Sequence, residues 1–211
     1  MTESDNGYAV PAGRVVGGTL QPPPSKSLTQ RALNLTLLAR RSVTIERPLV
    51  ASDTDHYLAA LTALGFEISR EGDQICLTPG ILPQKAELWC GHNGTMLRFL
   101  TAALAALPGD WLLDGSERLR QRTVGPLVDA LRPLGACIDF AGRQGFAPLH
   151  VSGAALRGGE VELDAGQSSQ FASALLMALT QAQGPVSARI QPLVSTPYLD
   201  LTLDTLDAFG A

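Results

Sequence analysis

The 211-residue chain has little of several residue types that would place it in other classes of protein. Only 17% of its residues are charged and 5% are aromatic, whereas 45% are hydrophobic. This balance excludes a mainly disordered chain. The formal net charge of −4 lacks the basic excess of a general nucleic-acid-binding protein, so we expect no nucleic-acid partner.

Cysteine and long apolar runs are also scarce. Cys76, Cys90 and Cys137 include no C-x-x-C pair, which favours free thiols over a disulfide framework or a zinc site. No apolar run is long enough to cross a bilayer, and the residues after Met1 do not form a signal peptide. The sequence therefore predicts a cytoplasmic protein with no membrane contact, no metal and no cofactor.

Lysine is rare among the basic residues. The 16 lysines and arginines comprise 14 arginines and only two lysines, Lys26 and Lys85. Coding preference explains this ratio more simply than function does. A compact ammonium nevertheless cannot be replaced by a guanidinium everywhere. Each retained lysine is therefore a candidate functional residue.

A repeat of about 70 residues organises the chain. Three segments begin with polar helix-start residues, continue with apolar residues at helical spacing and end in a capping glycine: 52–68, 123–138 and 195–211. The glycines are Gly65, Gly135 and Gly210, which lie 70 and 75 residues apart. An apolar helix is predicted before each segment: 27–39, 95–107 and 168–179.

Strands are predicted between and after these helices. The segments are 42–46, 111–113 and 186–190, followed by the pairs 66–69 with 74–78 and 136–140 with 149–152. The unit is thus helix–strand–helix–strand–strand, packed pseudo-symmetrically in an α/β (α+β) fold, with units at about 21–85, 86–155 and 156–211. The third unit stops at its second helix, which predicts exposed apolar surface around Leu199, Leu201, Leu203 and Leu206.

Polar residues stand at the starts of the first helices, whose N-termini converge if the units pack alike. The starts carry Lys26-Ser27, Gly94-Thr95 and Ser168-Ser169-Gln170, with Arg31 and Arg98 one turn further on. Arg118, Arg120 and Arg122 form a basic run before a second helix. Helix N-termini and guanidinium groups suit phosphate and carboxylate ligands. Taken singly, however, such residues are more often N-caps and solvated arginines.

Other catalytic motifs are missing. The chain contains no G-x-x-x-x-G-K-[ST], no G-x-G-x-x-G, no H-E-x-x-H and no G-x-S-x-G. His56, His92 and His150 are scattered along the sequence. These absences disfavour nucleotide, zinc and serine-nucleophile chemistry.

Five motifs resemble the 5-enolpyruvylshikimate-3-phosphate synthase family and occur in its order. They are Ser25-Lys26-Ser27 with Arg31, Gly91 to Arg98 (GHNGTMLR), Arg120-Gln121-Arg122, Ser168-Ser169-Gln170-Phe171 and Ser195-Thr196-Pro197-Tyr198. The resemblance implies one domain of a two-domain inside-out α/β barrel. It also implies that residues 1–20 belong with the other domain and that 21–211 form the shikimate-3-phosphate-binding domain.

The family transfers the enolpyruvyl group of phosphoenolpyruvate to shikimate 3-phosphate, the reaction that glyphosate inhibits. The resemblance implies that shikimate 3-phosphate contacts Lys26, Ser27, Arg31, Ser168, Ser169, Gln170, Ser195 and Tyr198. It implies that phosphoenolpyruvate contacts Lys26, Gly94, Thr95, Arg122 and Gln170. No catalytic residue is assigned in this half, apart from an electrostatic role open to Lys26.

Departures from the family pattern leave alternatives open. His92 stands where the family usually has Asn, and Thr123 follows Arg122 where Pro is usual. The acid/base carboxylates of the family belong to its second half, so we expect this chain to be weakly active or inactive alone. The missing domain or self-association would then complete it. A non-catalytic anion-binding module and a UDP-N-acetylglucosamine enolpyruvyl transferase are the alternatives.

Overall fold

Helices and strands alternate along the chain in a computed structural model that describes residue 13 and residues 17–211. The first unit contains α1 (Lys26–Ala39), β1 (Val43–Glu46), α2 (Ser52–Ala63), β2 (Phe66–Glu71) and β3 (Gln74–Pro79). The predicted helices and strands of this unit are confirmed. Residues 17–20 form no helix or strand. The rest of segment 1–20, which the resemblance assigns to the other domain as a strand, lies outside the described residues apart from residue 13.

The second and third units begin with a strand that the sequence analysis did not predict. The second unit contains β4 (Lys85–Trp89), α3 (Gly94–Ala105), β5 (Gly109–Asp114), α4 (Gly125–Leu131), β6 (Cys137–Phe140) and β7 (Leu149–Gly153), with 3₁₀ turns η1 (Leu119–Gln121) and η2 (Arg132–Leu134). The third contains β8 (Gly159–Leu163), α5 (Ser169–Leu179), β9 (Val186–Ile190) and α6 (Pro197–Phe209). The predicted helix–strand–helix–strand–strand order is present in the first two units, but the prediction missed β4 before α3 and β8 before α5. Both strands are short and place charged residues at alternate positions.

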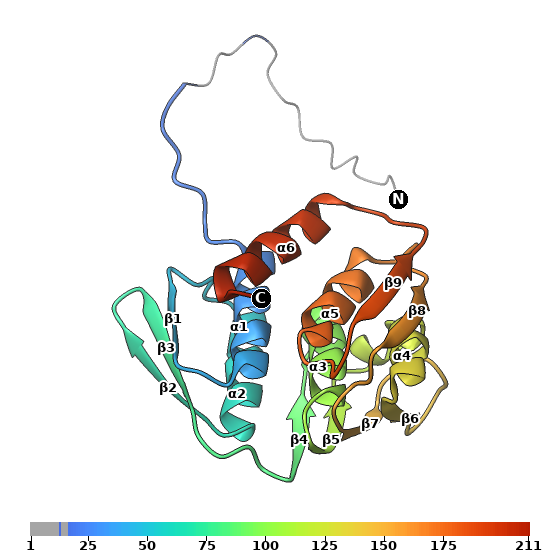
Figure 1. Cartoon of the computed structure of the whole chain (residues 1–211). Helices are drawn as coiled ribbons and strands as arrows, with labels where there is room; N and C mark the ends of the chain where they lie inside the picture. The colour runs from blue at the N-terminus through green and yellow to red at the C-terminus, as the bar shows by residue number, and fades with distance from the viewer. Residues whose placement is uncertain (1–12, 14–16) are drawn as a thin grey trace, which may run out of the picture.

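The sheets repeat one pairing scheme. β4 pairs in parallel with β5, and β8 pairs in parallel with β9. The orders β1-β3-β2 and β5-β7-β6 are the same antiparallel arrangement in successive units. Figure 1 shows β1–β3 on one side of the molecule and β8–β9 on the other, with α1, α3 and α5 between them.

The core lies between these central helices. α3 is buried along its whole length except at Thr95, and it packs against α1, α4 and α5. Alanines at 102, 103 and 105 let neighbouring helices approach closely, and Phe99 and Phe171 are fully buried. None of the helices among the described residues is both long and apolar enough to cross a bilayer.

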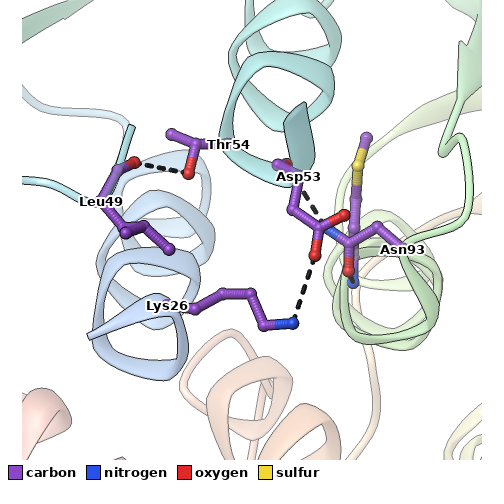
Figure 2. A network of polar contacts seen from close by, with 6 residues as sticks. Lys26, Leu49, Asp53, Thr54 and Asn93 are labelled. Atoms are coloured by element: carbon purple, nitrogen blue, oxygen red, sulfur yellow. Dashed lines mark hydrogen bonds and ion pairs between the residues drawn. The ribbon is translucent and has the colours of Figure 1, made fainter. Parts of the chain in front are cut away.

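Helix ends follow part of the predicted capping chemistry. Gly65, Gly135 and Gly210 all have positive φ, which confirms the three closing glycines. Ser168 caps α5 by accepting a hydrogen bond from the Gln170 N–H at 3.2 Å. The polar start predicted for 52–68 does not cap α2, because Ala51 is the N-cap and Thr54 donates its hydroxyl to the Leu49 carbonyl (Figure 2).

The last helix, α6, packs on α1 and α5. Leu203 is 47% exposed, as expected for this helix, but Leu206 is only 8% exposed. The predicted apolar surface therefore extends over Leu203 and excludes Leu206, because α6 turns that leucine toward the core.

Candidate functional site

Asp53 connects the starts of three helices. Lys26 Nζ lies 3.3 Å from its Oδ2 at the start of α2. The side-chain amide of Asn93 donates to the Asp53 carbonyl at 3.3 Å, and Asn93 Oδ1 caps α3 by accepting from the Met96 N–H. Figure 2 shows Lys26 and Asn93 on opposite sides of Asp53. Because the Lys26 side chain is 54% exposed, its ammonium remains accessible to an anion.

Gly94 lies directly against Arg122. A Cβ added at Gly94 would meet Arg122 Cδ and Nη1 at 2.9 Å, which is closer than side chains approach. Arg122 follows η1 and is exposed. The absence of a side chain at position 94 therefore lets a guanidinium lie across the start of α3, beside the half-buried Thr95.

Arg98 joins α3 to the starts of α4 and α5. Its Nη1 donates to Gln170 Oε1 at 2.6 Å and to Ser168 Oγ at 3.3 Å. Its Nε and Nη2 donate to the Thr123 carbonyl at 3.3 and 3.1 Å. The guanidinium carbon lies 4.7 Å from the centre of the Phe171 ring. Burial, together with the charge of Arg122, lowers the pKa of Arg98 to about 10, so it stays charged at neutral pH.

Arg31 faces the interior and contacts residues of α5 and α6. Its Nε donates to Thr202 Oγ1 at 2.8 Å, and Nη2 donates to Ser173 Oγ at 2.8 Å and the Tyr198 carbonyl at 2.9 Å. Nη1 donates to the Ser27 carbonyl at 3.0 Å. Burial lowers its pKa to about 10. The structure thus places this predicted ligand contact in an internal hydrogen-bond network, with every guanidinium nitrogen engaged.

The remaining predicted residues lie at helix starts. Ser27 is partly buried, Ser169 is buried and Gln170 is partly exposed. Ser195 has a left-handed backbone, with φ of 54°, just before α6. Tyr198 is 45% exposed, and the centre of its ring lies 5.9 Å from the Arg31 guanidinium carbon. His92 is exposed and makes a 2.5 Å hydrogen bond to Ser116.

Contacts between elements bring these residues into two groups. The first contains Lys26 with Asp53 and Asn93, and the second contains Arg98 with Ser168 and Gln170. The sequence analysis counted Arg98 among the basic residues of the helix starts without assigning it a substrate contact, and it assigned no site role to Asp53 or Asn93. Asn93 stood inside the GHNGTMLR motif, and Arg98 ended it, so the motif itself contained the signal for both.

A large groove of the molecule is separate from this region. It encloses about 920 Å³ between the Pro22–Pro24 segment, α1 and the β1 side of the first sheet. None of the predicted site residues lines it. The candidate site is therefore the polar face formed by the helix starts, and this groove is not part of it.

Comparison with known proteins shows which family this chain belongs to. The family model described as EPSP synthase (3-phosphoshikimate 1-carboxyvinyltransferase) matches residues 10–211. The chain belongs to the EPSP synthase family. The five motifs and the repeated units of the fold agree with this membership.

Individual relatives are similar to this chain over about half of their own length. The 3-phosphoshikimate 1-carboxyvinyltransferase of Shewanella amazonensis is 42% identical over 202 residues, which are 92% of this chain and 47% of that protein. The enzyme of the same name from Cupriavidus necator is also 42% identical and is covered to 46%. The EPSP synthase structure from Acinetobacter baumannii superposes with a TM-score of 0.79 at 26% identity, covering 92% of this chain and 44% of that one. The chain thus spans about half the length of these EPSP synthases.

Proposed function

We propose that this chain is the shikimate-3-phosphate-binding half of an enolpyruvyl transferase. The complete reaction would join the enolpyruvyl group of phosphoenolpyruvate to the 5-hydroxyl of shikimate 3-phosphate and release phosphate. The observation that carries the proposal is the linked set of helix starts, where Lys26, Arg122, Ser168 and Gln170 supply cationic and neutral donors. Such donors suit the phosphate and carboxylate groups that both substrates carry.

The proposed contacts divide between the two substrates. Shikimate 3-phosphate would contact Lys26, Ser27, Arg31, Ser168, Ser169, Gln170, Ser195 and Tyr198. Because every guanidinium nitrogen of Arg31 already donates to protein, this residue would reach the ligand only through the second N–H of Nη1. Phosphoenolpyruvate would contact Lys26, Gly94, Thr95, Arg122 and Gln170.

Proton transfer is the part of the reaction that this half supports least. Addition and elimination require an acid that protonates the enol carbon and a base that later removes a proton. Within the described residues, the carboxylate in contact with a predicted site residue is that of Asp53, and it is paired with the Lys26 ammonium. We therefore propose that this chain binds substrate but turns over weakly or not at all alone. The other half, or self-association through α6, would complete or cover it.

Titration calorimetry with shikimate 3-phosphate tests the binding claim. The chain should bind this ligand and should not bind UDP-N-acetylglucosamine. The Arg132→Lys variant should keep the affinity, because Arg132 is an exposed residue of η2, directly after α4, and contacts none of the proposed site residues. Absence of shikimate 3-phosphate binding would favour a non-catalytic anion-binding module, and preference for the UDP-sugar would favour the other transferase.

A phosphate-release assay with both substrates tests the activity claim. The monodisperse chain should release phosphate slowly or not at all, and sedimentation should show association. Robust turnover by a compact monomer would overturn the expectation that this half is incomplete.

A further inference from the structure

We propose that Arg98 is a positioning residue that turns Ser168 and Gln170 into hydrogen-bond donors toward a bound anion. The identity of that anion rests on the proposed function, but the orientation of the two side chains does not. Arg98 is only 9% exposed, and its guanidinium lies over the Phe171 ring. It therefore acts from beneath the polar face, through the side chains that it holds.

The orientation of Gln170 follows from the chemistry of the guanidinium. Arginine has five N–H donors and no acceptor, so only an oxygen can face it at 2.6 Å. Oε1 of Gln170 is thus committed to Arg98, and the two N–H groups of Nε2 point elsewhere. Within the described part of the chain, Nε2 donates to no protein acceptor. Both donors are free for a ligand.

Ser168 is oriented by the same arginine. Its Oγ accepts from the Gln170 backbone N–H at 3.2 Å and from Arg98 Nη1 at 3.3 Å. A hydroxyl has two lone pairs and one proton. Because both lone pairs are engaged, the proton is the remaining polar group, and Ser168 can only donate to a ligand.

Arg98 also engages a third acceptor, the backbone carbonyl of Thr123, which follows Arg122 in the chain. The Thr123 carbonyl accepts two hydrogen bonds from Arg98, through Nε and Nη2. An unpaired carbonyl beside an anion site would oppose binding of the anion. Arg98 thus engages one acceptor from each of three residues and leaves donors exposed, which selects for anionic groups over neutral or cationic ones.

Lysine cannot replace this arrangement. Its ammonium is a compact point charge and does not span three acceptors in the fixed geometry of a guanidinium. In the Arg98→Lys variant, Gln170 becomes free to rotate its amide and to present Oε1 to the ligand. The affinity for shikimate 3-phosphate should then fall about 10-fold, as expected for one charge-assisted hydrogen bond.

A double-mutant cycle separates positioning from general destabilisation. Arg98→Lys and Gln170→Ala should each lower the affinity about 10-fold, and the double variant should lose little more than either alone. Arg132→Lys is the matched control, since Arg132 also stacks on a phenylalanine and donates to a backbone carbonyl away from the site. Fold losses that multiply in the double variant, or wild-type affinity in Arg98→Lys, would overturn the proposal.

A readout without the substrate distinguishes failure of this proposal from failure of the proposed function. In the ¹⁵N-labelled chain, the Gln170 side-chain NH₂ signals should shift in Arg98→Lys and stay in place in Arg132→Lys. Inorganic phosphate should shift them in the wild-type chain. If shikimate 3-phosphate does not bind but both shifts occur, the positioning role stands and the assigned substrate is wrong. Signals that do not respond to Arg98→Lys, or to phosphate, overturn the positioning role itself.

Discussion

Arg31 and Arg98 occupy similar places in successive units but serve different ends. Each lies one turn into a first helix, each is nearly buried, and burial lowers the pKa of each to about 10. Arg31 donates to α5 and α6 and consolidates the interior. Arg98 donates to Ser168, Gln170 and Thr123 at the polar face. The same residue type at nearly the same helical depth thus engages interior acceptors in one unit and acceptors at the polar face in the next.

The register of the helices explains the difference. Ser27 and Thr95 are corresponding helix-start residues, so Arg98 corresponds to Gln30 and Arg31 corresponds to Phe99. A difference of one residue rotates a side chain by about 100° around a helix. The Phe99 ring lies 5.5 Å from the Arg31 guanidinium carbon, so the corresponding positions meet in the core.

The largest expected effect is the loss of Arg31. Arg31→Met removes hydrogen bonds that link α1, α5 and α6 and should lower the free energy of unfolding by about 3 kcal/mol. Urea denaturation measures the loss, and amide hydrogen exchange should show α6 opening first. The control is Arg41→Met, which removes an exposed arginine that also contacts α6 at Phe209. A smaller loss for Arg31→Met than for this control would contradict the structural role.

Loss of Arg98 should destabilise the fold less than loss of Arg31 and should weaken the binding of shikimate 3-phosphate more. Arg98→Met should lower the free energy of unfolding by about 2 kcal/mol, because Ser168 and Thr123 lie closer to solvent than Ser173 and Thr202. Urea denaturation and calorimetry on the same samples give both quantities. The comparison between the two arginines fails if Arg98→Met is the more destabilising variant.

Gly94→Ala should affect binding with little change in stability. The added Cβ conflicts with the flexible end of Arg122 and with no backbone atom within 3 Å, so a shift of that side chain relieves the contact. We expect a stability loss below about 1 kcal/mol and weaker binding of phosphoenolpyruvate by the shikimate-3-phosphate complex. Calorimetry measures this binding. Gly17→Ala, at a position with open space, should leave it unchanged, and equal effects of the two variants would refute the account.

Asp53→Asn should also have little effect on stability. It removes an ion pair whose lysine is half exposed, so the free energy of unfolding should change by at most about 1 kcal/mol. Asp55→Asn removes the exposed pair with Arg70 on the same helix and is the matched control. Only Asp53→Asn should change the salt dependence of phosphoenolpyruvate binding, because it frees the Lys26 ammonium. A stability loss comparable to that of Arg31→Met would show that the contacts among Lys26, Asp53 and Asn93 stabilise the fold and would contradict this prediction.

The sequence by itself determined the family, the repeat, both sets of helices and the helix starts that carry the predicted site residues. These features are local: apolar spacing, capping glycines and short motifs are visible within a few turns. Strands β4 and β8 were not predicted, because a segment of five residues with alternating polarity forms a strand only when it pairs with a neighbouring strand.

Only the tertiary structure decided which acceptors each of the two arginines engages. Arg31 meets Thr202 across 171 residues of sequence, and Arg98 meets Gln170 across 72. A motif shows that an arginine is present one turn into a helix, but its direction depends on which acceptors the fold brings within reach. A buried guanidinium needs partners to offset its desolvation, so those distant oxygens fix its role.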